Sequence, residues 1–382
     1  MDLVAGRAWA QERKPIRHVD LVLVTVVVVL QVAGLFLLYS ATNQTLVGDG
    51  LDPFTRVNKQ LITFAISGGV VVALTLFDYR FAKIYAGIVY AAMLVSLVLV
   101  RIPGLGATDA TGTAQRWFQI AGFQITPSEF MKIGLIVMLA AMLSEIRDPV
   151  PSLRDIVRLV GVAALPLLLV FAQPDIGTSV ALVAIVVGML IVAGAGAKQL
   201  AVLAISGAGL LFLVFQSGAI EQYQLDRIRV VVDREAVSPD VRYNIDQSLR
   251  AVGGGGVLGQ GYLQGRQTLL DFVPEQHTDF IFTVAGEEFG FLGAMTILLL
   301  YALLLWRAIR IAFLSKDPFG TYLAAGIASM FAIQMFVNVG MVIGIMPITG
   351  IPLPFLSYGG SSLLASFIAI GLLENVHMRR YG

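Results

Sequence analysis

The sequence contains no cysteine and only three histidines among its 382 residues. Without cysteine the chain can form no disulfide, no thiolate metal site and no cysteine nucleophile. The histidines, His18, His277 and His377, lie far apart and show none of the spacings of a zinc site, so we predict no metal site. Charged residues are also scarce, at 13%, against about 25% in soluble domains. The formal net charge of +1 gives no indication of a nucleic-acid partner.

Apolar residues, in contrast, make up 57% of the sequence. A soluble core stops growing at about 250–300 residues, so it has no room for this much apolar side chain, and lipid is the natural solvent for the excess. The sequence therefore predicts an all-α membrane protein, a polytopic bundle of about ten transmembrane helices. The apolar runs that mark these helices lie near residues 20–40, 59–77, 81–101, 127–146, 156–172, 177–197, 199–218, 280–308, 320–346 and 355–376.

Basic residues are distributed unevenly between the two sides of this predicted bundle. The first apolar run, from about Leu21 to Leu38, is too long for a signal peptide, so we interpret it as an uncleaved helix that follows a cytoplasmic tail, residues 1–19. The inner segments then hold Arg7, Arg13, Lys14, Arg17, Arg80, Lys83, Arg147, Arg154, Arg158, Lys198, Arg307, Arg310, Lys316, Arg379 and Arg380. The short outer segments hold far fewer basic residues. This positive-inside pattern predicts that both termini are cytoplasmic.

Two outer regions are long enough to carry a site within what is otherwise one integral membrane domain, residues 1–382. One is residues 102–126, and the other is a large extracytoplasmic loop between the seventh and eighth helices, residues 219–279. The larger loop contains a glycine run, namely Gly253, Gly254, Gly255, Gly256, Gly259, Gly261 and Gly265. Glycine lets backbone approach a ligand closely, so the run could cradle a sugar or a pyrophosphate, or it could be a flexible linker.

Carboxylates gather where the large loop meets the eighth helix. Asp271, Glu275, His277 and Asp279 lie within nine residues of one another. Asp279 stands at the boundary between water and lipid, where partial desolvation raises the pKa of a carboxyl toward that of a useful base. Aspartate is also a preferred helix cap, and the sequence leaves both interpretations open. Glu275 and His277 could tune Asp279, bind substrate or simply be solvated.

Charged and aromatic residues near the other helix ends form a second group of candidates. Glu129 and Lys132 can pair at the start of the fourth helix, or Lys132 can meet a phosphate. Arg116 and Trp117 suit recognition at the headgroup level, although a tryptophan there is also an ordinary interface anchor. Asp175 follows a proline and is interpreted as a helix cap.

Two further features concern the last three predicted helices. Glu287 and Glu288 lie within the eighth helix, and intramembrane carboxylates are either functional or paired. The outer segment 347–362 is broken by prolines and glycines. Broken backbone at membrane depth is tolerated only where protein or a cavity covers it, so this segment is predicted to be a pocket wall.

Taken together, these residues resemble the SEDS family (shape, elongation, division and sporulation), and within it RodA more than FtsW. The resemblance covers nearly the whole chain and rests on Ala114–Trp117, Pro127–Lys132, Gln173–Thr178, Asp226–Ile228, Gln247–Ser248 with the following glycines, Leu270–Phe282 and Pro352–Ser362. The Leu270-Asp271-Phe272 start of the Asp279 motif favours the RodA branch. One position departs from the family pattern, because Thr126 stands where the family usually has glutamine.

The resemblance implies ten helices and polymerisation of lipid II into glycan strands at the outer face of the bacterial cytoplasmic membrane, for cell elongation and rod shape. The family's essential carboxylate falls on Asp279. The residues expected to bind substrate are Arg116, Trp117, Glu129, Lys132, Arg227, Gln247, Ser248, Glu275, His277 and Ser357. The implied partners are a class B penicillin-binding protein, which is a transpeptidase, and other membrane proteins of the elongation complex.

The mechanism expected from this resemblance is simple. Asp279 would take the proton of the 4-hydroxyl of an N-acetylglucosamine, while Arg116, Lys132 and Arg227 hold the pyrophosphate. A divalent cation, Mg²⁺ or Mn²⁺, could assist, but the sequence shows no dedicated ligand set. The alternatives are a lipid II flippase, which would need polar residues across the bilayer midplane, and a non-catalytic scaffold for a transpeptidase, which would not need Asp279.

Overall fold

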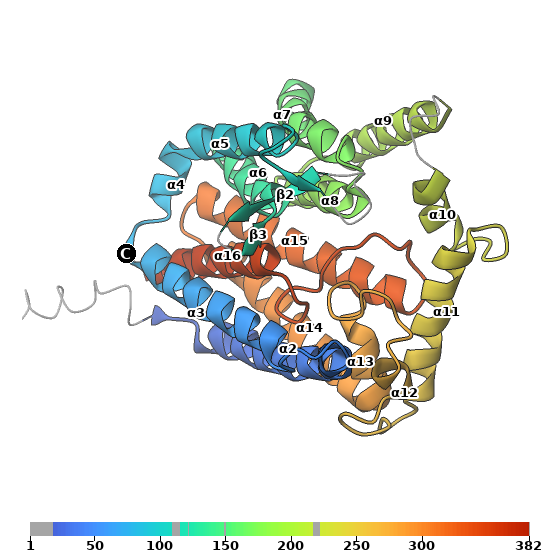
Figure 1. Ribbon diagram of the computed structural model, residues 1–382. Coiled ribbons are helices and arrows are strands. Elements are labelled where there is room, and N and C mark those ends of the chain that lie inside the picture. The colour runs from blue at the N-terminus through green and yellow to red at the C-terminus, as the bar shows by residue number, and fades with distance from the viewer. Residues whose placement is uncertain (1–17, 109–114, 121, 149, 217–221, 382) are drawn as a thin grey trace, which may run out of the picture.

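The computed structural model describes residues 18–108, 115–120, 122–148, 150–216 and 222–381. The predicted cytoplasmic tail, residues 1–19, lies outside these ranges except for its last two residues, and so do residues 219–221 of the predicted large loop. Arg7, Arg13, Lys14 and Arg17 therefore have no described position. Within the described ranges the chain is a bundle of long helices with one small sheet (Figure 1).

The elements before the large loop are helices with one interruption by strands. The helices are α2 (Leu21–Gly48), α3 (Thr55–Leu76), α4 (Arg80–Ile84), α5 (Ala86–Leu99), α6 (Pro127–Leu143), α7 (Leu153–Phe171), α8 (Ile176–Val192) and α9 (Ala197–Gln216). Between α5 and α6 lies an antiparallel sheet in the order β1 (Ala107–Thr108), β2 (Gln115–Ile120) and β3 (Phe123–Ile125).

The large loop is itself mostly helical. It contains α10 (Gln222–Arg229), α11 (Pro239–Gly254) and α12 (Arg266–Leu269). It is followed by α13 (Ile281–Glu288), α14 (Gly290–Leu314), α15 (Pro318–Val342), α16 (Gly360–Met378) and the short 3₁₀ helix η2 (Arg379–Tyr381).

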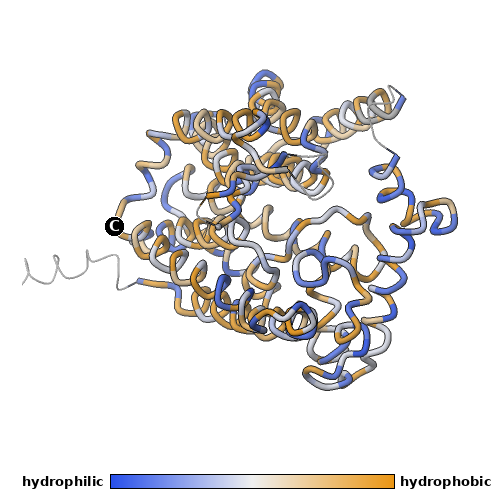
Figure 2. The backbone as a smooth tube through the Cα atoms, viewed as in Figure 1, coloured by the Kyte–Doolittle hydropathy of each residue, from blue (hydrophilic) through white to orange (hydrophobic). Residues whose placement is uncertain are grey.

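Five of the described helices, α2, α3, α14, α15 and α16, are long and apolar enough to cross a membrane. Helices α5 and α8, and residues Ala197–Leu210 of α9, are apolar but shorter. The apolar helices are the orange segments of Figure 2. A helical, multi-pass architecture is thus present, whereas the number of ten spans stays a prediction.

Three predicted spans differ from the helices observed. The predicted third span, 81–101, is divided at Tyr85 into α4 and α5. The predicted eighth span, 280–308, is divided into α13 and α14, because the chain turns at Gly290, which has φ +64°. The predicted last span began at residue 355, but α16 begins at Gly360. Pro352 and Pro354 lack the N–H that a helix needs, and Phe355 has φ +69°, so the chain is not helical before that glycine.

The two C-terminal helices form the centre of the bundle. Helix α15 packs against α6, α8 and α14, and α16 packs along α3 (Figure 1). Within the most apolar stretch of each helix, 72% of the residues of α15 and 89% of those of α16 are buried, against 11% of those of α3. Helices α15 and α16 therefore contact protein, and α3 leaves most of its surface for lipid.

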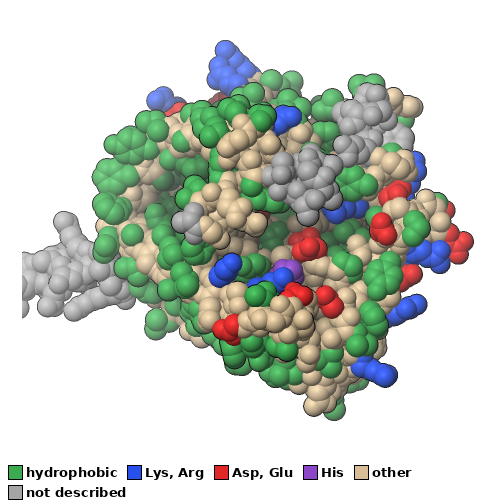
Figure 3. Space-filling model, viewed as in Figure 1, with side chains coloured by type: hydrophobic (Ala, Val, Ile, Leu, Met, Phe, Trp, Pro, Cys, Tyr) green, Lys and Arg blue, Asp and Glu red, His purple; other side chains and the backbone are tan. Residues whose placement is uncertain are grey.

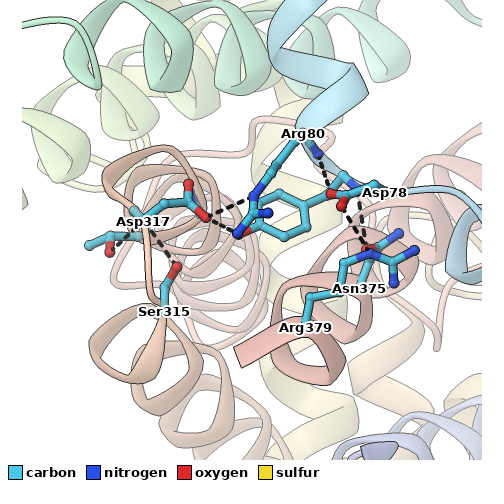
Figure 4. Close-up of polar contacts among 9 residues, drawn as sticks. Asp78, Arg80, Ser315, Asp317, Asn375 and Arg379 are labelled. Carbon is cyan, nitrogen blue, oxygen red and sulfur yellow. Dashed lines mark hydrogen bonds and ion pairs between the residues drawn. The ribbon is translucent and has the colours of Figure 1, made fainter. Parts of the chain in front are cut away.

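Ion pairs and hydrogen bonds close one end of this bundle (Figure 4). Asp78, after α3, pairs with Arg379 at 3.5 Å, and Arg80 of α4 pairs with Asp317, before α15, at 3.7 Å. The buried amide of Asn375 in α16 donates to two carbonyl oxygens at the end of α3. These contacts join the end of α3 to the loop before α15 and to the end of α16. The other ends of these three helices lie on the opposite side of the bundle.

Candidate functional site

A cavity of about 730 Å³ opens where α3, α6, α8 and α16 begin. Strands β2 and β3, helix α10, the turn 275–279 and the non-helical segments 349–352 and 358–359 complete its wall. Figure 3 shows acidic, basic and histidine side chains gathered around a hollow on this face of the molecule. The predicted pocket wall, residues 347–362, thus contributes directly to a polar cavity in an otherwise apolar bundle.

Asp279 lines this cavity from the turn that precedes α13. Phe280 occupies the N-cap position of α13, and no side chain caps that end of the helix. The carboxylate is therefore not used as a cap, which was one of the two interpretations left open by the sequence. Hydrogen bonds instead hold the main chain of Asp279. Its N–H donates to the backbone carbonyl of Glu275 (3.1 Å), and its backbone carbonyl accepts from Asn338 Nδ2 (2.8 Å).

The surroundings of Asp279 favour its protonated form. Enclosure in the cavity raises the pKa of its carboxyl from 3.8 to about 7, and the negative charges of Glu275 and Asp175 add to that rise. The positive charges of Arg227 and Arg116 oppose it. A carboxylate with a pKa near neutrality can both accept a proton and release it at physiological pH, which is the property that a general base requires.

His277 and Glu275 lie in the same turn. Burial lowers the pKa of His277 to about 4, assisted by Arg56 and opposed by Asp271, so its imidazole is neutral at pH 7. Its ring lies 5.8 Å from that of Tyr358, and its carbonyl accepts the Tyr358 N–H at 3.0 Å. Glu275 is exposed at the cavity and has φ +51°. His277 can therefore exchange hydrogen bonds with a sugar, but it is not a cation for phosphate.

The three cations predicted to hold phosphate, Arg116, Lys132 and Arg227, all line the cavity. Arg116 of β2 donates to the carbonyl of Pro174 at 3.1 Å, and its buried Nε has no partner among the described residues. Lys132 of α6 is buried and pairs with Glu129 at 2.8 Å. A ligand anion that enters the cavity therefore meets donors that protein groups use only in part.

Two positions from the strand region also reach the cavity. Trp117, beside Arg116 on β2, lines it, as does Thr126, where the family pattern has glutamine. The backbone N–H of Thr126 donates to Ser361 Oγ at 2.9 Å, and Ser361 in turn donates to the carbonyl of Gln124. This bond ties the start of α6 to the start of α16 through the main chain, so it does not depend on the side chain at 126.

One wall of the cavity was missed by reasoning from sequence. Arg56, Lys59, Gln60 and Thr63 of α3 all line it. Their spacing of i, i+3, i+4 and i+7 places them on one face of a helix. A polar stripe on one face at the end of a membrane helix was the signal that could have found them.

Asp175 has the structural role expected from sequence and a place in the cavity as well. Its Oδ1 accepts the N–H of Thr178 (2.9 Å), which caps α8, and Oδ2 accepts from Ser128 (3.3 Å). The cap thereby joins the first turns of α6 and α8.

Three residues expected to bind substrate lie outside the cavity. Ser248 is fully buried, and its hydroxyl donates to the carbonyl of Val342 at 2.8 Å. The hydroxyl of Ser357 accepts the N–H of Leu353 at 2.8 Å, which holds the turn before α16. Gln247 is buried in α11. Burial against other elements of the protein leaves these three little surface and no place in the cavity, so their contact with substrate stays a prediction that the cavity does not support.

The glycine run has a packing role, which is neither of the two interpretations left open by the sequence, a ligand cradle or a flexible linker. None of its glycines lines the described cavity. A Cβ at Gly255 would lie 2.0 Å from the carbonyl oxygen of Gly286, and one at Gly259 would lie 2.1 Å from that of Glu288. The loop therefore needs glycine at these positions because its backbone lies directly against α13.

The two intramembrane carboxylates are paired, as one of the two interpretations expected. Glu287 accepts hydrogen bonds from the N–H groups of Gln267 (2.7 Å) and Thr268 (3.1 Å) and from the Thr268 hydroxyl (2.8 Å). Glu288 accepts from Ser40 of α2 at 2.5 Å. Glu287 thereby anchors the large loop to α13, and Glu288 anchors α2 to α13.

A divalent cation finds no dedicated site in the described part of the chain. No group of three or more histidine, aspartate or glutamate side chains there could hold a metal ion. Asp279 and Glu275 share one turn of the cavity wall and Asp175 caps α8, but the three do not form such a group. The described residues therefore offer no ligand set for the Mg²⁺ or Mn²⁺ that the sequence left possible.

Comparison with known proteins identifies the family. A family named for FtsW, RodA and SpoVE, and described as "Cell cycle protein", matches residues 20–382. The chain belongs to this family. Its membership and its apolar helices make it a multi-pass membrane protein. A solved chain from a study of "polymerization and crosslinking by a peptidoglycan synthase complex" matches with a TM-score of 0.79 at 27% identity, over 95% of this chain and 98% of that one.

The comparisons do not decide between the branches of the family. Stage V sporulation protein E of Bacillus subtilis is 38% identical over 94% of this chain and 96% of its own length. The probable peptidoglycan glycosyltransferase FtsW of Trichlorobacter lovleyi is 38% identical over 95% of each chain. The peptidoglycan glycosyltransferase MrdB of Escherichia coli is 31% identical over 95% and 94%. The predicted preference for the RodA branch therefore gains no support from these identities.

Proposed function

We propose that the chain is a peptidoglycan glycosyltransferase that polymerises lipid II at the outer face of the bacterial cytoplasmic membrane. The observation that carries the proposal is the position of Asp279 in an enclosed polar cavity beside Arg116, Lys132 and Arg227. The names of the relatives support the reaction type. The orientation rests on the concentration of basic residues, including Arg80, at the end of the bundle away from the cavity.

The proposed reaction forms one glycosidic bond and breaks one bond to pyrophosphate. The 4-hydroxyl oxygen of an N-acetylglucosamine attacks the anomeric carbon of a second lipid-linked sugar, and the pyrophosphate leaves with the bonding electrons. Asp279, as carboxylate, takes the hydroxyl proton. The cavity cations stabilise the negative charge that develops on the leaving group, which typically contributes about 10²–10³-fold per donor. Exclusion of water from the cavity favours transfer to the sugar over hydrolysis.

The alternatives raised by the sequence are less well supported. A flippase needs a polar path through the bilayer, but the charged lining residues described here come from helix starts and outer loops at one end of the bundle. A scaffold has no need for a carboxylate whose pKa lies near neutrality. Neither alternative accounts for a base and three cations in one cavity.

A class B penicillin-binding protein is the partner that we propose. The matched synthase complex, by its name, coordinates polymerisation with crosslinking, and the described chain contains no transpeptidase domain. The Leu270-Asp271-Phe272 sequence favours an elongation partner and other elongation-complex membrane proteins, whereas relatives named FtsW favour division. Complementation of a strain depleted of RodA and of a strain depleted of FtsW distinguishes a role in elongation from a role in division.

The test of the reaction is a gel assay of glycan products from labelled lipid II, with the purified protein and its cognate transpeptidase. Asp279→Asn and Asp279→Ala are compared with the natural sequence, and Asp271→Asn is the matched control, because Asp271 is an exposed carboxylate of the same loop outside the cavity. We expect polymer from the natural protein and from Asp271→Asn, and none from folded Asp279 variants. Equal polymer from the Asp279 variants would refute the assigned base.

A further inference from the structure

A single buried amide joins the Asp279 turn to the neighbouring segment that contains Ile351. Asn338 lies in α15, four residues before the helix ends, and is fully buried. Its Nδ2 donates to the carbonyl oxygen of Asp279 at 2.8 Å and to that of Ile351 at 2.7 Å. Both protons of one amide are therefore used to hold two segments that are far apart in sequence.

The segment that contains Ile351 is a junction for the other groups of the site. The N–H of Ile348 donates to the carbonyl of Arg227 at 3.3 Å, which ties α10 to this segment. A Cβ at Gly350 would lie 3.1 Å from Asp279 Oδ2 and 3.9 Å from Arg227 Nη1. The carboxylate and the guanidinium therefore both lie against this glycine, whose φ of +73° leaves no place for a side chain.

Packing by itself does not require asparagine at position 338. The side chain lies within an apolar helix, and its Oδ1 is buried without a hydrogen-bond partner among the described residues. A buried polar atom without a partner destabilises the folded state. An apolar side chain would avoid this cost, but it could not donate to two carbonyls at once.

We infer that Asn338 is a positioning residue for glycosyl transfer. Its amide sets the place of the Asp279 turn relative to the segment that contains Gly350 and that is bonded to the main chain of Arg227 in α10. The inference rests on the proposed role of Asp279 as base. Asn338 itself contacts no reacting atom. Its removal leaves every cavity-lining side chain present and loosens only their relative placement.

The chain offers a matched control in Asn375. This second buried asparagine also donates through Nδ2 to two carbonyls, those of Leu74 and Phe77, at 2.5 and 2.6 Å. It lies at the far end of α16, about 20 Å or more from the cavity at 1.5 Å per residue. Asn338→Ala and Asn375→Ala each remove two hydrogen bonds donated by a buried Nδ2, and Asn375→Ala also removes the bond that Oδ1 accepts from the Tyr79 N–H at 3.3 Å. The control variant therefore loses at least as many bonds, and the pair separates a loss of stability from a loss of placement.

The experiment measures thermal stability and lipid II polymerisation for both variants with the transpeptidase partner present. We expect similar losses of stability, whereas the rate at saturating lipid II falls about 10–100-fold in Asn338→Ala alone, the scale of a misplacement of about 1 Å. The KM should change less than about threefold, because the phosphate-binding cations remain. Asn338→Ser retains one donor and should lie between the natural protein and Asn338→Ala; it replaces the alanine variant if that variant does not fold.

The pH profile provides a readout that a general structural defect does not move. The charged groups that face Asp279 are Glu275, Asp175, Arg227 and Arg116. Loosening the turn admits water, so the acid limb of the rate profile should move to lower pH in Asn338 variants and stay in place in Asn375→Ala. Equal rates and equal profiles for the two asparagine variants overturn the inference. Full activity of Asp279→Asn in the same assay overturns instead the proposed base, so the two failures are distinct.

Discussion

The buried pair of Lys132 and Glu129 provides a sharp test of whether a cavity cation has a role beyond stability. The two side chains lie at i, i+3 in the first turns of α6, with Nζ and Oε2 2.8 Å apart, and their exposed fractions are 2% and 11%. An ammonium group has three donors. Only one bond of Lys132, to Glu129, occurs within the described residues, and the side chain lines the cavity. The remaining donors are available to a phosphate.

The perturbation is a cycle of Lys132→Met, Glu129→Gln and the double variant. Each single variant leaves one buried charge without its partner, which costs about 3–5 kcal/mol of unfolding free energy. The double variant removes both charges and should return to within about 1–2 kcal/mol of the natural protein. Arg242→Met is the control, because its pair with Asp246 is 3.7 Å long and both side chains are well exposed. Its loss should cost less than about 1 kcal/mol.

Equilibrium unfolding in mixed micelles measures the stabilities, and the lipid II gel assay measures polymerisation. We expect the double variant to recover its stability but to remain about 10²-fold or more slower, because one donor to a developing anion is lost. A double variant that recovers both stability and activity would show that Lys132 only neutralises Glu129. That result would refute its assignment to the pyrophosphate.

Two further predictions concern the base and the packing around it. Asp279 must be ionised to take a proton, and its pKa is about 7. The rate of polymerisation should therefore fall as the pH is lowered through 7. Glu275→Gln removes a charge that raises this pKa, so it should move the fall in rate to lower pH. Gly34→Ala in α2 should destabilise the protein by about 1–3 kcal/mol, since its Cβ would lie 2.6 Å from the carbonyl oxygen of Phe355; unchanged unfolding would contradict this.

The sequence predicted those parts of the site in which composition and local pattern suffice. Apolar runs of spanning length have few alternatives to a membrane helix, so the described helices outside the large loop lie where such runs were found, whereas α10, α11 and α12 do not. Asp279, Arg116 and Lys132 were identified because charge is rare in this chain; Asp279 and Lys132 also stand beside helix starts, whereas Arg116 lies in β2. The polar face of α3, at Arg56 and Lys59, carried a comparable local signal that was not used.

Other features depend on contacts between distant segments. Ser248 and Asp279 belong to the same predicted loop, but the fold buries one against α15 and places the other in the cavity. The glycine run could have met a ligand or a helix with equal ease, and only the placement of α13 decides for the helix. Asn338 is a single polar residue in an apolar run, and nothing local connects it to the carbonyls of Asp279 and Ile351.

The sequence by itself therefore determined that the chain is a helical membrane protein with its charge concentrated between the apolar runs, because hydrophobic length and charge are properties of neighbouring residues. The tertiary structure decided which polar groups share the cavity and which only join elements. It also raises the pKa of Asp279 through enclosure and neighbouring charge. The physical reason is that desolvation and charge proximity arise because α3, α6, α8, α10 and α16 meet at one place, and no single segment contains that arrangement.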